Sequence, residues 1–556
     1  MLLPAVACAI NAQWDLDPIS GDWNTAANWT PTGIPNGPAD IATFGLSHTT
    51  DVSISANTEV SGITFTSAAT NPYLITVSSG LTLTLSGAGI MNNSGITQRF
   101  FIGDPFENGA GAQIRFINGA TAGNANISCF DMSSSVQFWN RSSAGNATIA
   151  TQGNDSGSII FFNRSTAANA TIYGISGGSV DFFDTSTAGS ATITNAGALH
   201  MSVTFHDNST AGSATLDPGE EESISFFDRS TAGSTTILGG GHGTIDFFDF
   251  STAGSSMIST YATLVSFYGF SKGGTAAIQL LFGSAFEAPS WLDISQHNAP
   301  GVTIGSLEDD GTATAIVFLG ANNLTIGSNN LSTTFSGVIQ DGGLGGGGVG
   351  GSLTKIGTGT LDLTGANTYT GNTNINRGVL QVDGSITSNT FVNHGGTLAG
   401  AGTINGNVTN FGRVMPGALG VPDQLTVVHS YTQTQYATLM IQIAGTSAGQ
   451  FSVLDVMGNA NLNGYLDPVL LNGFVPTIGD SFTFLNYASF TGEFSHIKHQ
   501  VFDNGMLQWS VIYQNNGAIL TVGPNTIPDQ GSTFLLMTLG LLGLVAYRRQ
   551  LLGERP

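Results

Sequence analysis

Four aspartates recur at one position of an internal repeat, and this spacing makes them the first candidates for chemistry. They are Asp184, Asp207, Asp228 and Asp249. A column of carboxylates can bind calcium weakly, and it can also serve as a sugar-binding or glycosidase-like array. Stacked carboxylates about 5 Å apart repel one another unless solvent, a cation or an arginine lies beside them. We favour a solvated corner column over a cation site, and a cation site over catalysis.

A G-x-S-x-G motif at residues 269–273 is the second candidate. In a hydrolase this motif forms a nucleophile elbow, which needs a turn from a strand into a helix. Here Ser271 takes the place of a corner residue in the repeat. The nine histidines are scattered, and no Cys/His spacing typical of a zinc site is present. We therefore expect no catalytic residue, no enzyme activity and no cofactor, with calcium as the one ion worth testing.

Eight copies of a short pattern must position these residues, and successive copies begin 20–23 residues apart. Each copy has an aromatic strand, a Ser-Thr-Ala-Gly corner and a second strand. A unit this short cannot bury a core alone, whereas strands stacked in register about 4.8 Å apart share one. The pattern predicts an all-β fold, a parallel β-helix, with positive φ at corner residues such as Gly189, Gly212, Gly233 and Gly254. It also predicts an internal aromatic column of Phe116, Phe138, Phe161, Phe182, Phe205, Phe226, Phe247 and Phe267.

The composition narrows the function classes. The 556 residues carry a formal net charge of −23, only 9% of them are charged, and 41% are hydrophobic. Binding to nucleic acid requires clustered Lys and Arg, so we expect no nucleic-acid partner. Four of the six tryptophans, Trp14, Trp23, Trp29 and Trp139, could stack on sugars, but we favour a buried or capping role.

The chain divides into six expected segments. Residues 1–12 resemble a signal peptide whose start can lie upstream of Met1, and residues 13–115 are expected to form an N-terminal capping region. The eight repeats occupy residues 116–282, and residues 283–417 continue the β-helix. Residues 418–526 are expected to form a C-terminal β-rich module that is separate from the β-helix. Residues 527–556 are expected to form a sorting tail. The glycine tract at 342–351 predicts a flexible loop or a linker.

Residues 351–384, GSLTKIGTGTLDLTGANTYTGNTNINRGVLQVDG, resemble the autotransporter-associated β-strand repeat. The matching residues are Leu353, Lys355, Gly357, Gly359, Leu361, Leu363, Gly365, Asn367, Tyr369, Gly371, Thr373, Gly378 and Leu380. In that family the repeat forms one section of a surface-exposed β-helix and has no catalytic residue. The resemblance therefore implies an exported protein with a structural repeat.

The C-terminal tail resembles the PEP-CTERM class of sorting signals, in particular the subtype that begins V-P-D-S-G. An uncharged run at 534–547 lies between the motif and an arginine pair, and we expect it to form a single membrane-spanning helix oriented by the arginines. The resemblance implies recognition by an exosortase-like membrane enzyme during export. The motif residues are Ile527, Pro528, Asp529, Gln530, Gly531, Ser532 and Thr533, followed by Arg548 and Arg549.

Together these features predict an exported bacterial protein of the cell surface or extracellular matrix with a structural or adhesin-like role. Its expected partners are extracellular polysaccharide or surface components, and the membrane before processing of the tail. The alternative is a polysaccharide lyase or hydrolase, or a carbohydrate-binding protein, on the same β-helix, because such folds also host those activities.

Overall fold

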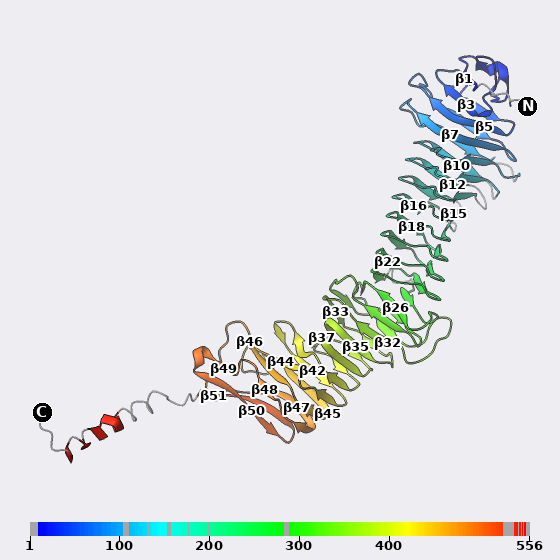
Figure 1. The fold of residues 1–556 in the computed structure, drawn as a ribbon. Helices are drawn as coiled ribbons and strands as arrows, with labels where there is room; N and C mark the ends of the chain where they lie inside the picture. Colours follow the sequence, from blue (N-terminus) through cyan, green and yellow to red (C-terminus); the bar gives the residue numbers. More distant parts are fainter. Residues whose placement is uncertain are drawn as a thin grey trace, which may run out of the picture.

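The structure is a computed structural model, and it shows one long, bent solenoid of β-strands (Figure 1). The all-β solenoid expected from the repeats is thereby confirmed. The described residues are 9–103, 110–130, 133–152, 157–175, 177–197, 201–282, 288–525 and, in the tail, 539–542, 544–545, 547–548 and 550–551.

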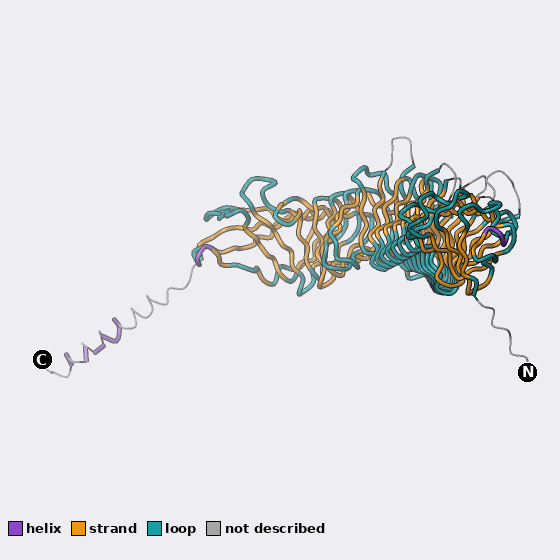
Figure 2. The backbone as a smooth tube through the Cα atoms, turned by 90° about the horizontal axis from the view of Figure 1, so that it is seen from above, coloured by secondary structure: helices purple, strands orange, loops and turns teal. Residues whose placement is uncertain are grey.

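Two parallel sheets run along the N-terminal half of the solenoid, and each coil contributes one strand to each sheet. Viewed from above, the coils of this half lie closely stacked along its length (Figure 2). The first sheet contains, in spatial order, β2 (Trp29–Thr30), β1 (Asn11–Trp14), β3 (Gly37–Phe44), β5 (Thr58–Phe65), β7 (Thr82–Asn92), β9 (Gln113–Phe116), β11 (Ser135–Phe138), β13 (Ser158–Phe161), β15 (Gly178–Phe182), β17 (Met201–Phe205), β19 (Ser223–Phe226), β21 (Thr244–Phe247), β23 (Leu264–Phe267), β25 (Trp291–Asp293), β28 (Ile316–Phe318) and β31 (Val338–Gln340). The second sheet contains β4 (Asp51–Ile54), β6 (Leu74–Val77), β8 (Arg99–Ile102), β10 (Asn126–Phe130), β12 (Thr148–Gln152), β14 (Thr171–Gly174), β16 (Thr192–Asn195), β18 (Thr215–Gly219), β20 (Thr236–Gly239), β22 (Met257–Tyr261), β24 (Ala277–Leu281) and β27 (Ser306–Asp309).

A third sheet collects the strands of the C-terminal half. Its strands are β26 (Gly301–Ile304), β29 (Asn323–Ile326), β30 (Thr333–Phe335), β32 (Ser352–Lys355), β33 (Thr360–Leu363), β34 (Ala366–Asn367), β35 (Thr373–Val382), β36 (Ser385–Ile386), β37 (Thr390–Gly400), β38 (Thr403–Ile404), β39 (Val408–Asn410), β40 (Arg413–Ala418), β41 (Val421–Pro422), β42 (Gln424–Val427), β43 (Tyr431–Gln433), β44 (Thr438–Ile443), β45 (Val453–Leu462), β46 (Tyr465–Leu470), β47 (Ser481–Gly492), β48 (His496–Ile497), β49 (Val501–Phe502), β50 (Leu507–Gln514) and β51 (Gly517–Pro524). Two short 3-10 helices, η1 (Ala26–Asn28) and η2 (Asp503–Gly505), lie near the two ends of the solenoid.

The predicted phenylalanine column is confirmed as the core of the repeat region. All eight rings are fully buried, and neighbouring rings stack with centroids 4.7–4.9 Å apart and planes inclined by 4–9°. The alternation of buried and half-buried residues along each strand directs one face inward, as in β19. Each coil therefore adds one rung to a continuous hydrophobic column.

Each residue of the Ser-Thr-Ala-Gly corner has its own structural role. In the coil that contains Gly189, Ser186 and Ala188 are buried, and Thr187 pairs with the threonines of the neighbouring coils. The Thr187 hydroxyl accepts a hydrogen bond from the Gly189 N–H at 2.9 Å. Gly189 has φ +65°, as predicted, and a Cβ there would lie 2.8 Å from the carbonyl oxygen of Ala168 in the coil before. The backbone angle and the limited space favour glycine at this corner, although Ala168 occupies the equivalent position one coil earlier with φ +53°.

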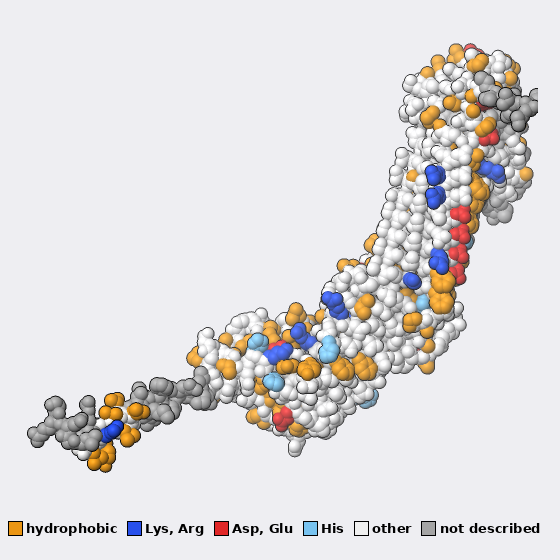
Figure 3. All heavy atoms as spheres, in the orientation of Figure 1, with side chains coloured by type: hydrophobic (Ala, Val, Ile, Leu, Met, Phe, Trp, Pro, Cys, Tyr) orange, Lys and Arg blue, Asp and Glu red, His pale blue; other side chains and the backbone are white. Residues whose placement is uncertain are grey.

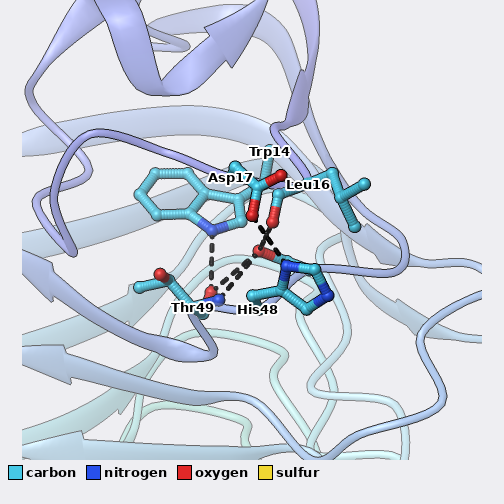
Figure 4. Close-up of polar contacts among 6 residues, drawn as sticks. Trp14, Leu16, Asp17, His48 and Thr49 are labelled. Carbon is cyan, nitrogen blue, oxygen red and sulfur yellow. Dashed lines mark hydrogen bonds and ion pairs between the residues drawn. The ribbon is translucent and has the colours of Figure 1, made fainter.

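Three tryptophans close the N-terminal end. Trp14, Trp23 and Trp29 are at most 1% exposed and pack around Phe44 with ring centroids 5.6–6.0 Å from it. The Trp14 indole N–H donates to the carbonyl oxygen of Thr49 at 3.0 Å (Figure 4). The capping role favoured from the sequence is therefore confirmed for these three residues.

The strands expected to form a separate C-terminal module continue the third sheet. β40 spans the expected boundary at residue 418 and pairs in parallel with β44, and β42 pairs in parallel with β45. Apart from the short β40–β41 hairpin, antiparallel strand pairing in this region lies at the far end, where β50 pairs with β49 and β51 pairs with β47 and β50. The β50–β51 hairpin closes the last coil, so the β-rich region acts as a continuation of the solenoid and its cap.

The glycine tract is a hydrogen-bonded loop between β31 and β32. The Asp341 carboxylate accepts the N–H groups of Gly350 and Gly351 at 3.1 and 2.9 Å, and Asp293 accepts that of Leu344 at 3.0 Å. The linker alternative is wrong, because the tract connects two strands of the same solenoid and is fixed by two carboxylates.

Within the described residues, no helix is long and apolar enough to cross a membrane. Residues 1–8 of the expected signal peptide lie outside the described residues, and so do the sorting residues Ile527, Pro528, Asp529, Gln530, Gly531, Ser532, Thr533 and Arg549. Arg548 lies in a described helical stretch of the tail.

Candidate binding surfaces

The aspartate column is a hydrogen-bonded ladder that joins neighbouring coils. Asp184, Asp207, Asp228 and Asp249 all have left-handed backbone angles, with φ between +54° and +59°. The Oδ2 atom of each accepts the backbone N–H of the equivalent residue one coil earlier, at 2.8–3.2 Å. Asn118, Asn140 and Asn163 occupy the same position with φ of +58° to +62°, and Gly269 has φ +60°.

This geometry explains the residue types in the column. Asn, Asp and Gly are the residues that adopt the left-handed conformation most readily, and Asn and Asp also supply the acceptor that the ladder needs. One oxygen of each aspartate is therefore used in the fold. The interpretation as a solvated corner column agrees with this arrangement. In the part of the chain that the structure describes, no group of three or more His, Cys, Asp or Glu residues could hold a metal ion.

A second aromatic column lies at the surface beside the ladder. Its rings are half-buried and stack with centroids 3.9–5.3 Å apart and planes inclined by 4–20°. Because each ring face lies against a neighbour, the column presents mainly ring edges to solvent. The column consists of Trp139, Phe162, Phe183, His206, Phe227, Phe248 and Tyr268.

The outer column was not predicted from the sequence. Its signal was the doubled aromatic in each Phe-Phe-Asp segment: the first ring points into the core and the second lies at the corner. Trp139, considered above only as a sugar platform or a capping residue, is the first ring of the column.

Two shallow pockets lie along the corner of the coils that carries the aspartate ladder. One of about 400 Å³ is lined by Asp207, Asp228, Asp249, Asn208, Arg229 and Phe250, and the other, of about 460 Å³, lies around Arg141 and Arg164. The Arg229 guanidinium lies 5.7 Å from the centre of the Phe250 ring. Figure 3 shows the carboxylates as a red stripe with basic and hydrophobic side chains along its edges. No ion pair joins these arginines to the aspartates in the described coils.

The G-x-S-x-G motif does not form a nucleophile elbow. Ser271 is 2% exposed, and its hydroxyl has no hydrogen-bond partner. The nearby His297 Nε2 lies 2.8 Å from the carbonyl oxygen of Ser271, not from its hydroxyl. Equivalent serines in other coils are buried in the same way, so this position is a structural corner residue, as expected.

A third pocket, of about 450 Å³, was not foreseen. Its lining includes Glu308, Asp309 and Asp362 from β27 and β33. Asp309 accepts the N–H groups of Ser336 and Gly337 and thus holds the backbone. Burial, reinforced by the charge of Asp383, raises the pKa of Asp362 to about 6, and its Oδ1 atom is buried without a hydrogen-bond partner. These acids come from neighbouring coils but share no repeat position, so no sequence pattern linked them.

Comparisons with known proteins agree with the fold. The passenger-associated-transport-repeat family matches residues 353–382, which run from β32 into β35. The adhesin BmaC autotransporter of Brucella suis is 40% identical over 118 residues, which are 20% of this chain and 3% of that protein. An extracellular serine protease of Serratia marcescens is 48% identical over 68 residues, 12% of this chain and 6% of that protein. The chain therefore matches only a small part of the length of these relatives.

Proposed function

We propose that this protein is exported to the bacterial cell surface or extracellular matrix and acts there as a structural or adhesive rod. The observation that supports this most strongly is the passenger-associated repeat, which is built into the coils of a continuous parallel β-helix. Similarity to a segment of an autotransporter adhesin points in the same direction.

The proposed mechanism is multivalent weak contact. The outer aromatic column and the aspartate ladder repeat the same groups at each coil, with rings 3.9–5.3 Å apart. A periodic polymer that contacts one coil is held at high effective concentration next to the following coils, so weak contacts add to a useful avidity. The proposed partners are extracellular polysaccharide or other surface components.

We also propose that the C-terminal tail directs sorting by an exosortase-like enzyme. The support is the order of the sequence motif, the apolar run and the arginine pair that includes Arg548. In this proposal the tail holds the protein in the membrane before processing.

Labelling of intact cells tests the proposed location. An antibody against the repeat region should label intact producer cells, and external protease should remove the signal. Deletion of residues 527–556 should leave the protein folded but reduce the labelled fraction. Labelling that appears only after the cells are lysed would contradict the surface role, whereas equal labelling without the tail would contradict only the sorting proposal.

A polysaccharide hydrolase is the second candidate, and the pocket around Asp362 is the observation that favours it. A carboxyl group with a pKa near 6 can donate a proton at neutral pH, and Glu308 supplies a second carboxylate in the same pocket. Asp362→Asn should abolish any release of new sugar ends, whereas Asp309→Asn should mainly lower stability. Turnover that survives Asp362→Asn would exclude this pocket as its site.

A further inference from the structure

A pocket of about 280 Å³ lies at a corner of the C-terminal half and differs in character from the acidic surfaces. Three rings surround it, contributed by the same corner of three successive coils, together with a guanidinium and two hydroxyl groups. The side chains that matter are His394, Phe411, Tyr436, Arg413, Thr397 and Thr438.

Glycines explain why the surface is hollow here. A Cβ at Gly396 would lie 2.2 Å from the carbonyl oxygen of Ile375, and one at Gly412 would lie 2.2 Å from that of Asn393. Close packing of the coils therefore excludes side chains at both positions. The longer side chains named above form the sides of the depression that remains.

The charge of this pocket is opposite to that of the molecule. The chain has a net charge of −23, yet the described lining residues include no carboxylate. Arg413 opens β40, is exposed, and makes no hydrogen bond or ion pair with any described side chain. Figure 3 shows Lys, Arg and His side chains gathered on this half of the molecule.

The next cation along this face is already partnered. Lys498 Nζ lies 3.1 Å from Thr438 Oγ1 and 3.6 Å from Asp467 Oδ2. Arg413 differs from Lys498 because none of the described residues bonds to its planar guanidinium group. The donor fork of that group matches the two oxygens of a carboxylate.

The rings of the pocket can also offer their faces. His394 and Phe411 meet at 62° with centroids 6.4 Å apart, whereas the outer column has nearly parallel rings that cover one another. Tyr436 is 67% exposed. An open aromatic face next to hydroxyl groups suits a ligand that is apolar on one side and polar at its rim, which describes a sugar ring.

We propose that this pocket binds one hexuronate unit of an acidic polysaccharide. Arg413 binds the carboxylate, Tyr436 stacks on the sugar ring, and Thr397 and Thr438 bond its hydroxyl groups. The Asp467 carboxylate near Thr438 is paired with Lys498, and the field of the aspartates farther along the solenoid is screened over about 8 Å at physiological ionic strength. The inference rests on the proposed surface role and gives it a ligand class.

The test measures binding of a galacturonate trimer to the purified full chain by calorimetry, with its fully methyl-esterified form as the uncharged probe. The free acid should bind, and the ester should bind at least roughly tenfold more weakly. Arg413→Gln should lower affinity for the acid by roughly tenfold or more, and Tyr436→Ala should lower it for the same ligand. Arg99→Gln removes one exposed positive charge far along the chain and should leave the affinity unchanged.

The outcomes separate the site from general electrostatics. Equal losses in Arg413→Gln and Arg99→Gln, equal binding of acid and ester, or full competition by an equimolar amount of inorganic phosphate would each overturn the proposal. Unchanged melting temperatures of the variants exclude misfolding as the cause. If cells still attach to their matrix through this protein while the trimer does not bind, the uronate site is wrong and the surface role stands.

Discussion

The aspartate ladder has a structural role that does not depend on any ligand. Each aspartate accepts a backbone N–H from the preceding coil while its own backbone is left-handed, so both its side chain and its conformation serve the fold. Asn163 performs the same task one coil before Asp184. The negative charge is not required for this task, which gives the ladder a direct test.

Asp228→Asn should therefore keep the stability of the protein, and Asp228→Ala should lower it by about 1–2 kcal/mol through loss of the hydrogen bond and of the left-handed preference. Chemical denaturation measures both changes, with Asn208→Ala as the exposed neighbouring control. Adding calcium or a chelator should not change the wild-type midpoint. A calcium-dependent midpoint that Asp228→Asn abolishes would show that the charge binds a cation.

Asp362 should give the protein a distinct pH dependence. Its pKa is raised from 3.8 to about 6 by burial and by Asp383, so ionisation costs more in the folded than in the unfolded state. Its contribution to stability is full below about pH 4 and is lost as the pH rises through 6. Because the group is partly exposed, we expect a loss of about 1 kcal/mol, less than the full shift implies. Asp362→Asn should remove this part of the profile, measured by denaturation between pH 4 and 7, and an unchanged profile would contradict the assignment.

At the scale of the element, the coil corner was the best predicted feature. The Ser-Thr-Ala-Gly pattern predicted a tight turn, and Gly212 and Gly233 have the expected positive φ. The inner phenylalanine column followed from the repeat length. The outer column did not, because strand alternation assigns the second aromatic to the opposite face and does not reveal that it stacks on the next coil.

Gly212→Ala should be far more damaging than a glycine substitution in an open turn. A Cβ at Gly212 would lie 2.6 Å from the carbonyl oxygen of Gly189, whereas one at Gly420, also with positive φ, meets nothing within 4 Å. We expect a loss of about 2–4 kcal/mol for Gly212→Ala and about 1 kcal/mol for Gly420→Ala. Equal losses in chemical denaturation would mean that the coils do not pack this closely.

At the scale of the whole molecule, the fold is one solenoid whose coils are nearly interchangeable over the repeat region. The sequence predicted this architecture because the repeats are explicit, and it predicted the residue types of the ladder without their bonding. It did not predict that the strands between residues 418 and 524 continue the same sheet, because these coils have no fixed repeat length from which the strand register could be read. The pockets at Asp362 and Arg413 were not predicted either, because their residues come together only when the coils are stacked.

Removal of one whole coil should preserve the fold. Deleting residues 205–225 brings Phe226 to the position of Phe205, and the ladder and both aromatic columns can close again. Circular dichroism should show an intact β-structure with cooperative melting. Deleting only residues 205–214 removes the corner between β17 and β18 and leaves one incomplete coil, which should abolish cooperative melting of the whole solenoid. Similar behaviour of the two deletions would contradict the coil-by-coil architecture.

The central claim, a surface rod that binds polysaccharide without turning it over, is tested most directly by one assay on the purified full chain. Immobilised acidic and neutral polysaccharides are scored both for retention of the protein and for release of new reducing or unsaturated ends. We expect retention on an acidic polymer with no new ends. Release of ends that Asp362→Asn abolishes would contradict the claim and identify an enzyme, and failure to be retained on any polymer would contradict its adhesive role.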